Sequence, residues 1–295
     1  MTSTNGSTEL SRPVSTVAVI SHGRVDVREA VGRVRAVADE AGVVVLDENA
    51  DPRDADLAVA LGGDGTILRT LARLLGSDVP VIGVNFGRVG FLAAIEPDGL
   101  ERDLRRVFAA EYVVLELPTL EVQLDGETHA AVNDVVATSE TLGRMVELAW
   151  AVGGEDLGTI PCDGMICATP SGSTAYNLSN GGPVLVRGLD AMAVTFIAPH
   201  SLHARPLVVP RGLDVTLVNQ TADVDVAVLV DGRPGGGAPR HTAEPARHAA
   251  GDDLLRPLPR DVHLTPLTWP ASGRGPAASL HSVRCCDGCA SRTWS

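Results

Sequence analysis

The sequence is short of basic residues and lacks any apolar run long enough to cross a membrane. Its 295 residues include 24 Lys and Arg against 37 Asp and Glu, which gives a formal net charge of −13. A membrane-spanning helix needs about 20 consecutive apolar residues, so no span is predicted. Interfaces with nucleic acid and with anionic membranes rest on clustered Lys and Arg. We therefore expect neither nucleic acid nor a membrane as the main partner.

Signal sequences and metal-ligand spacings are also missing. The first residues, Met1 to Pro13, are rich in Ser, Thr and Asn and lack the basic-then-apolar layout of a signal peptide. This predicts a cytoplasmic protein. Two of the five cysteines, Cys162 and Cys167, lie in an apolar-flanked segment that is typical of reduced, buried thiols. The histidines His200 and His203 have no third ligand at metal spacing, so no metal-binding residues are predicted.

Two common nucleotide-binding motifs are absent. There is no Gly-x-x-x-x-Gly-Lys-Ser/Thr loop, and no Gly-x-Gly-x-x-Gly follows the first expected strand. Neither a Walker-type ATPase nor the usual dinucleotide-binding domain is therefore supported. The composition, 44% hydrophobic and 21% charged, is ordinary for a globular protein, and the length fits one large or two ordinary domains.

The residues from 14 to 110 predict an α/β domain. Stretches with strand character alternate with stretches whose apolar residues recur at helical spacing. The expected strands are 15–21, 43–46, 56–61 and 80–85, and the expected helices are 25–42, 66–75 and 97–110. Such alternation is typical of a parallel sheet with flanking helices.

The residues from 111 to 233 predict a mostly antiparallel, all-β domain, because short β-rich segments follow one another without a long helical stripe. These segments are 112–115, 120–124, 130–138, 145–152, 164–169, 193–198, 215–218 and 226–230. The polar residues 1–13 are expected to form a disordered tail. The residues 234–295 hold eight of the nineteen prolines and no sustained apolar period, so we expect a disordered or aberrant tail there.

The first motif is Gly62-Gly63-Asp64-Gly65-Thr66, between an expected strand and an expected helix. Glycines allow a ligand to approach the backbone closely and permit unusual backbone angles, and a helix start favours phosphate. One interpretation is a phosphoryl-transfer site in which Asp64 accepts a proton from the attacking hydroxyl. The alternative is a structural turn in which Asp64 merely caps the helix.

Two further motifs lie in the β-rich part. Asn133-Asp134 interrupts an apolar run, and two polar residues there need partners if they are buried. They indicate ligand contacts, or alternatively a β-bulge or hairpin turn. The segment 162–183 is dense in hydroxyls, amides and glycines around Tyr176, which predicts recognition of a base and sugar.

Taken in order, these motifs resemble those of the ATP- or polyphosphate-dependent NAD kinases, and the resemblance covers roughly Val14 to Gly232. The most particular part is the run Thr169-Pro170-Ser171-Gly172-Ser173-Thr174-Ala175-Tyr176. The resemblance implies an α/β domain followed by a β domain, and a homo-oligomer, either a dimer or a tetramer. It also implies transfer of a phosphoryl group from ATP or polyphosphate, with Mg²⁺, to the adenosine ribose 2′-hydroxyl of NAD.

The resemblance also implies roles for individual residues. Asp64 corresponds to the catalytic base, and Asn133 with Asp134 corresponds to an Asn-Glu pair that holds the NAD ribose. The remaining positions that correspond to the family's cofactor contacts are Gly65, Arg69, Arg144, Asp163, Thr174, Ala175, Tyr176, Asn177, Leu178 and Ser179.

Two other functions stay open. A lipid kinase of the diacylglycerol type shares the glycine turn, although the acidic composition argues against a membrane-facing surface. A non-catalytic nucleotide-binding module would also fit, since no β pattern is found after Arg233.

Overall fold

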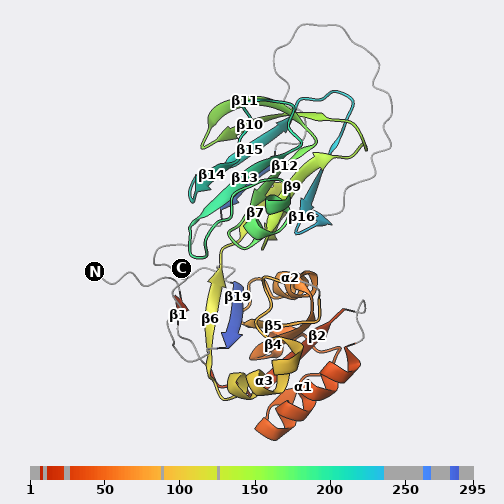
Figure 1. Ribbon diagram of the computed structural model, residues 1–295, viewed down its shortest axis with the longest axis vertical. Coiled ribbons are helices and arrows are strands. Elements are labelled where there is room, and N and C mark those ends of the chain that lie inside the picture. The colour runs from red at the N-terminus through yellow and green to blue at the C-terminus, as the bar shows by residue number, and fades with distance from the viewer. Residues whose placement is uncertain are drawn as a thin grey trace, which may run out of the picture. The chain divides into compact units, whose positions relative to one another are not determined.

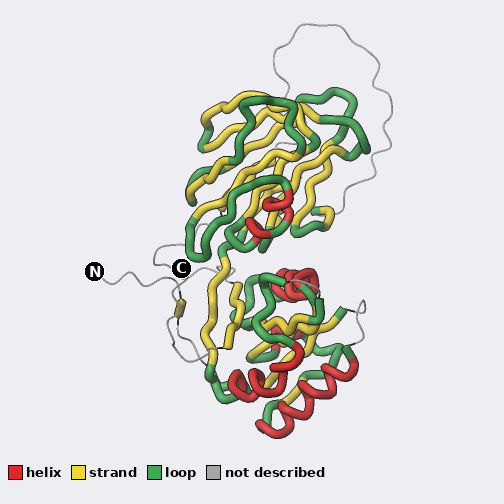
Figure 2. Tube along the Cα trace, in the orientation of Figure 1, coloured by secondary structure: helices red, strands yellow, loops and turns green. Residues whose placement is uncertain are grey.

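The computed structural model describes residues 7–8, 12–22, 27–87, 90–124, 127–235, 262–266 and 280–285. The described residues belong to two compact units, the first drawn from residues 1–117 and 269–295 and the second from residues 118–268. Figure 2 shows that the longer helices lie in the first unit and that strands dominate the second.

The first unit is a seven-stranded sheet with helices on both faces (Figure 1). The strands run in the order β1-β6-β19-β5-β4-β2-β3, and β2 to β5 are parallel to one another. Their bounds are β1 Ser7–Thr8, β2 Thr16–Ser21, β3 Val44–Val45, β4 Leu57–Gly62, β5 Val81–Asn85, β6 Tyr112–Leu117 and β19 Leu280–Cys285. The helices are α1 Arg28–Ala41, η1 Pro52–Asp54, α2 Asp64–Arg73, η2 Pro97–Gly99 and α3 Leu100–Phe108.

Helix α1 forms where the sequence places apolar residues on one side of a helix. Ala30, Val34 and Val37 are buried against the sheet together with residues of α3. The helix ends at Gly42, whose φ of +69° is the left-handed angle that glycine adopts without steric cost. Helix α2 lies on the opposite face of the parallel strands, as Figure 1 shows. The predicted parallel sheet with flanking helices is confirmed.

The second unit is a sandwich of two six-stranded sheets, in the orders β11-β10-β15-β18-β7-β8 and β14-β13-β12-β9-β16-β17. The strands are β7 Leu120–Leu124, β8 Glu127–Ala131, β9 Asp134–Ser139, β10 Val146–Val152, β11 Glu155–Cys162, β12 Gly164–Ala168, β13 Ala191–Ile197, β14 Leu207–Pro210, β15 Val215–Asn219, β16 Val226–Val230, β17 Arg233–Pro234 and β18 Val262–Pro266. Two short helices, η3 Gly172–Thr174 and α4 Tyr176–Ser179, complete it. All pairings are antiparallel, which confirms the predicted all-β second part.

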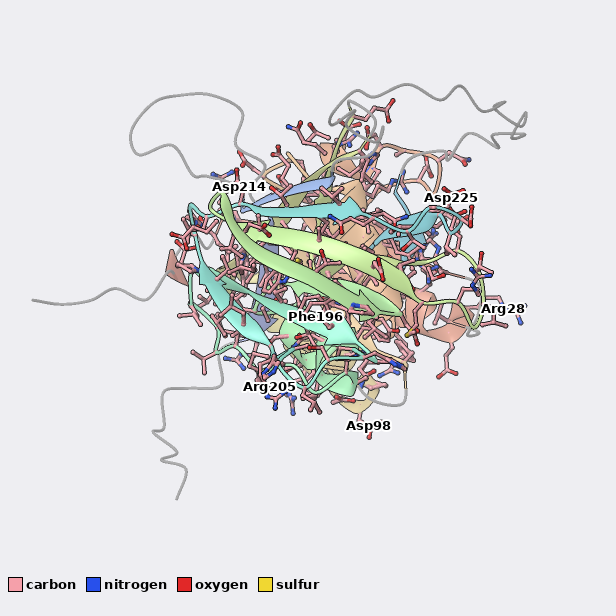
Figure 3. All side chains as sticks on the ribbon, turned by 90° about the horizontal axis from the view of Figure 1, so that it is seen from above. Arg28, Asp98, Phe196, Arg205, Asp214 and Asp225 are labelled. Atoms are coloured by element: carbon pink, nitrogen blue, oxygen red, sulfur yellow. The ribbon has the colours of Figure 1, made fainter. Side chains whose placement is uncertain are left out.

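The core of the sandwich is built from alternate residues of both sheets. On β12, Met165 and Cys167 face the other sheet, whereas Ile166 packs on the outer side. Trp150 of β10 meets Phe196 of β13 (labelled in Figure 3) edge to face, with ring centroids 5.2 Å apart. Both aromatic rings therefore join the two layers.

Three expectations differ from the structure. The expected segment 130–138 is two strands, β8 and β9, which belong to different sheets. Strand β11 was not predicted because it is a polar edge strand with little apolar alternation. Strand β1 and the bonds between Arg12 and Tyr112 lie within the expected tail 1–13, so that part of the tail is ordered by its pairing with β6.

The expectation that no strand follows Arg233 is wrong at two places. Strand β18 pairs with β15 and β7, and β19 pairs with β6 and β5. Each lies between two other strands and forms hydrogen bonds with both. These bonds stabilise a strand even though its sequence has little apolar alternation. The remaining residues of the expected tail, after Gly235, lie outside the described part of the chain.

Candidate functional site

The glycine turn joins a fully buried strand to a helix. All six residues of β4 are buried, and α2 begins at Asp64, directly after Gly63. The Gly63 carbonyl accepts the amides of Thr66 and Ile67 at 2.8 and 3.2 Å, which closes the first turn of the helix. The turn lies at the carboxyl end of a parallel strand, where open α/β sheets bind their ligands.

The Asp64 carboxylate does not cap its own helix. Its Oδ2 accepts the amide of Phe91 at 2.9 Å, and its Oδ1 accepts the amide of Leu92 at 3.2 Å. These donors lie in the loop after β5, far along the sequence. Both carboxylate oxygens are thus held by backbone, and each keeps capacity for a further hydrogen bond. The capping alternative for Asp64 does not describe this structure.

Within the turn, Gly62 is the glycine that the packing requires. A Cβ atom at Gly62 would lie 2.3 Å from Oγ1 of Thr66, and one at Gly63 would lie 3.5 Å from Cα of Gly87. None of Gly62, Gly63 and Gly65 has a positive φ. The expected unusual backbone angles are therefore absent from this turn. The Thr66 side chain leaves no room for a Cβ atom at position 62, whereas a Cβ atom at position 63 would make only an ordinary van der Waals contact.

Arg69 lies on α2, one turn and a half after Asp64. Its Nε atom is buried and has no hydrogen-bond partner among the described residues. Buried donors of this kind are nearly always satisfied. Arg69 is therefore a free cationic group beside the glycine turn, suited to an anionic ligand.

The second motif forms the corner where the chain passes from one sheet of the sandwich to the other. Strand β8 ends at Ala131 and β9 begins at Asp134, so Val132 and Asn133 make the crossing. Asn133 and Asp134 are both buried, with 8% and 6% of their surfaces exposed. The Oδ1 atom of Asn133 has no partner among the described residues. A buried, unpaired acceptor at a turn is the kind of group that a ligand hydroxyl satisfies.

The run that begins at Thr169 supports this corner from the other side. The Thr169 amide donates to the Asn133 carbonyl at 2.8 Å, and the Thr169 hydroxyl donates to the Val132 carbonyl at 2.7 Å. A Cβ atom at Gly172 would lie only 2.0 Å from that Asn133 carbonyl oxygen. Two motifs far apart in the sequence therefore form one structural unit.

Asp134 has an unusual acidity. Burial, and then the neighbouring Asp231 carboxylate, raise the pKa of Asp134 to about 7. Burial also raises the pKa of Asp231. Hydrogen bonds from three backbone amides and the charge of Arg233 lower that pKa in part, but the effect of burial is larger. Asp134 has no such donors in the described part of the chain, so it is the carboxyl of this pair that protonates first.

Residues 174–179 are placed in different ways. Tyr176, Leu178 and Ser179 are exposed, and the Thr174 hydroxyl donates to the Ser171 carbonyl at 3.2 Å. The Asn177 side chain is completely buried: it donates to the carbonyls of two residues, each at 3.0 Å, and accepts the Thr195 hydroxyl at 2.7 Å. Asn177 therefore shapes the segment, whereas Tyr176 presents its ring to solvent.

The other two expected contacts are exposed. Arg144 lies in the turn before β10, and its guanidinium has no hydrogen-bond or ion-pair partner among the described residues. Asp163 is exposed between β11 and β12, and its carbonyl accepts the Ser139 amide at 3.0 Å. Both side chains are free to meet a ligand.

Sequence reasoning missed three contributors. Phe91 and Leu92 act through their amides, and a backbone amide leaves no mark in the sequence. Asp231 holds the corner through its carboxylate, and its one signal is its position just after a strand in Val230-Asp231-Gly232.

In the ranges that the structure describes, no three His, Cys, Asp or Glu side chains converge as a metal site. Within the same ranges, none of the helices combines the length and the apolar character needed to span a membrane.

Two family models match the chain in order. The model of the ATP-NAD kinase N-terminal domain matches residues 18–112, and that of the ATP-NAD kinase C-terminal domain matches residues 132–240. Among solved structures, an NAD kinase from Archaeoglobus fulgidus in complex with ATP has a TM-score of 0.69 at 25% identity, over 92% of this chain and 94% of that one. Yeast NADH kinase complexed with NADH has a TM-score of 0.75 at 23% identity, over 94% and 85%, which shows likeness of fold alone.

Relatives in other organisms extend the comparison. The NAD kinase of Heliobacterium modesticaldum is 44% identical over 188 residues, which are 62% of this chain and 66% of that protein. The chain thus spans just under two thirds of the length of this relative. The NAD kinase of Thermomicrobium roseum is 38% identical over 224 residues, which are 73% of this chain and 76% of that protein. Both domain models match in sequence order, and the chain covers 76% of the Thermomicrobium roseum protein at 38% identity. The chain therefore belongs to the NAD kinase family.

Proposed function

We propose that the protein is an NAD kinase, which transfers a phosphoryl group to the adenosine ribose 2′-hydroxyl of NAD to give NADP. The observation that carries the proposal is the Asp64 carboxylate, fixed by two backbone amides at the start of α2 in a chain of this family. A carboxylate held in one orientation can accept the proton of an attacking hydroxyl. Phosphoryl transfer depends mainly on such positioning.

The corner at Asn133 and Asp134 is proposed to bind the ribose of NAD. The unpaired Oδ1 atom of Asn133 is an acceptor, and a protonated Asp134 carboxyl is a donor. A pair of ribose hydroxyls offers both a donor and an acceptor in return. The Asp134 side chain is one methylene shorter than the Glu of the Asn-Glu pair to which it corresponds.

The remaining contacts are proposed from their exposure and charge. Arg69 and Arg144 would meet phosphate or carboxamide oxygens, and Gly65 would offer its amide at the helix start. Asp163 would meet the nicotinamide end. The exposed ring of Tyr176, with the backbone and hydroxyl groups of Thr174, Ala175, Leu178 and Ser179, would contact the adenosine.

The donor is proposed to be ATP or another polyphosphate, together with Mg²⁺. The Archaeoglobus fulgidus relative is in complex with ATP, which supports ATP. Mg²⁺ is usually held by substrate phosphates with one or two carboxylates, so we expect the cation to arrive with the donor. Bound there, it would neutralise charge on the transferred group.

We also propose a cytoplasmic homo-oligomer, as the family resemblance implies.

The test is NADP formation by the purified chain with NAD, Mg²⁺ and either ATP or polyphosphate. Asp64→Asn is expected to lower kcat by about 10²- to 10⁴-fold, the range for loss of a general base, while NAD still binds in a calorimetric titration. Asp54→Asn makes the same charge change at an exposed position and should leave turnover unchanged. Near-normal turnover in Asp64→Asn would refute the base assignment, and a wild-type chain that phosphorylates diacylglycerol in place of NAD would refute the function.

A further inference from the structure

Asp231 occupies a tight turn and is tied to the Asn133–Asp134 corner by four hydrogen bonds. The turn joins β16 to β17. The Asp231 Oδ1 atom accepts the amides of Asn133 and Asp134 at 2.7 and 3.2 Å, and its Oδ2 atom accepts the amide of Val132 at 2.9 Å. In return, the Asp231 amide donates to the Asp134 carbonyl at 2.9 Å. One carboxylate thus satisfies every backbone donor of the corner.

The backbone of Asp231 shows that its side chain is needed. Its φ is +49°, in the left-handed region that is sterically unfavourable for residues other than glycine. Asp and Asn tolerate this region better than most residues. A glycine would suit the angle but would leave the amides of Val132, Asn133 and Asp134 without an acceptor.

The location of the corner explains why these three amides need a side-chain acceptor. At Val132 and Asn133 the chain leaves one sheet and enters the other, so regular strand pairing is interrupted. On the other side, Thr169 and Gly172 already pack against the Asn133 carbonyl. Asn133 is therefore clamped between Asp231 and the run that begins at Thr169.

We propose that Asp231 is a positioning residue for NAD: it fixes the backbone of Asn133 and Asp134 so that their side chains meet the ribose, and it does not itself touch the substrate. The inference rests on the proposed function and deepens it. The negative charge of Asp231 also opposes ionisation of the adjacent Asp134. The charged groups that the described structure places against this pair are the two carboxylates themselves and Arg233.

The test compares two variants that both suit the left-handed angle. Asp231→Gly removes all the acceptors, and Asp231→Asn keeps an oxygen acceptor but removes the charge. We expect Asp231→Gly to raise the KM for NAD by about tenfold or more, the effect of losing one to two hydrogen bonds, with kcat changed much less. The KM for the phosphoryl donor should stay near the wild-type value, and Asp231→Asn should recover part of the affinity for NAD.

A matched control is available in the first unit. Asp56 also accepts two backbone amides, those of Ser15 and Thr16, each at 2.8 Å. It precedes β4, at the end of that strand away from the glycine turn. Asp56→Gly should lower the melting temperature without changing the KM for NAD.

A pH profile separates positioning from a merely structural role. Because the protonated Asp134 carboxyl is proposed to donate to the ribose, the KM for NAD should rise as the pH passes the pKa of Asp134. In Asp231→Asn the repulsion that opposes ionisation of Asp134 is removed, so this rise in KM should occur at lower pH. A residue that only stabilised the fold would leave the transition where it is in the wild type.

The outcomes are distinct. If the wild type forms NADP and both Asp231 variants bind NAD as tightly as it does, the inference is overturned. It is equally overturned if Asp56→Gly weakens NAD binding as much as Asp231→Gly. If the wild type forms no NADP, the proposed function fails, and calorimetric titration of NAD into the same variants still decides whether Asp231 positions a binding corner.

Discussion

A Cβ atom added at Gly90 would lie 2.7 Å from Oδ1 of Asp64. The next two residues, Phe91 and Leu92, donate their amides to the same carboxylate. The loop can approach Asp64 this closely because position 90 has no side chain. Gly90 is thus part of the geometry of the proposed base although it has no functional group.

Gly90→Ala is expected to displace the Asp64 carboxylate and to lower kcat by about 10²-fold, the scale for misplacing a reacting group by about 1 Å. The affinity for NAD should change less. Steady-state kinetics of NADP formation, with a calorimetric titration of NAD, measure both quantities.

Gly32→Ala is the control for this change. Gly32 lies within α1, and an added Cβ atom there has no heavy atom within 4 Å. Because alanine favours a helix over glycine, this variant should be slightly more stable and equally active. Equal kcat in Gly90→Ala and the wild type would contradict the role given to the loop.

The raised pKa of Asp134 predicts how stability depends on pH. The Asp134 carboxyl has a pKa of about 7 in the folded state, above the ordinary aspartate value of 3.8. Its contribution to stability is therefore fully present below the unfolded pKa and is lost as the pH rises through about 7. Urea unfolding at a series of pH values should show that the free energy of unfolding of the wild type falls by up to a few kcal/mol as the pH rises through about 7.

Asp134→Asn should flatten this pH dependence, because the amide cannot ionise. Part of the slope will persist, since burial also raises the pKa of Asp231. Asp223→Asn removes an exposed carboxylate from the same unit and should keep the wild-type slope. A slope in Asp134→Asn as steep as that of the wild type would show that Asp134 is ionised throughout.

Substitution of Asn177 is expected to lower the free energy of unfolding more than it weakens the binding of NAD. Asn177→Ala leaves the Thr195 hydroxyl and the carbonyls of Ser173 and Pro183 without this partner. Unsatisfied buried polar groups cost about 1–3 kcal/mol each, so urea unfolding should show a large loss of stability. In Asn180→Ala, one exposed bond to the Tyr176 carbonyl is lost, and the loss should be well under half as large.

The fold of the first unit could be predicted because its elements are local. The buried strand β4 and the amphipathic helix α2 each have their own period, and Gly62 to Gly65 mark the boundary between them. The corner at Asn133 could not be predicted in the same way. The apolar residues on both sides of Asn133-Asp134 resemble one strand, and the carboxylate that holds the turn between β8 and β9 belongs to Asp231, 98 residues after Asn133.

The same distinction holds for the candidate site. Asp64, Asn133 and Asp134 were found because polar side chains interrupt apolar runs. The donors that hold Asp64 were missed because they are amides. Strands β18 and β19 were missed because their support comes from neighbouring strands on both sides.

The crossing at Val132 and Asn133 is at once one of the covalent links between the two layers of the sandwich and the place where the proposed ribose contacts lie. A ligand bound there would stabilise one of the connections between the two layers. By mass action, a ligand present at 100 times its Kd adds about 2.7 kcal/mol to the free energy of unfolding. The resistance of the second unit to heat and proteolysis would then increase with the concentration of NAD.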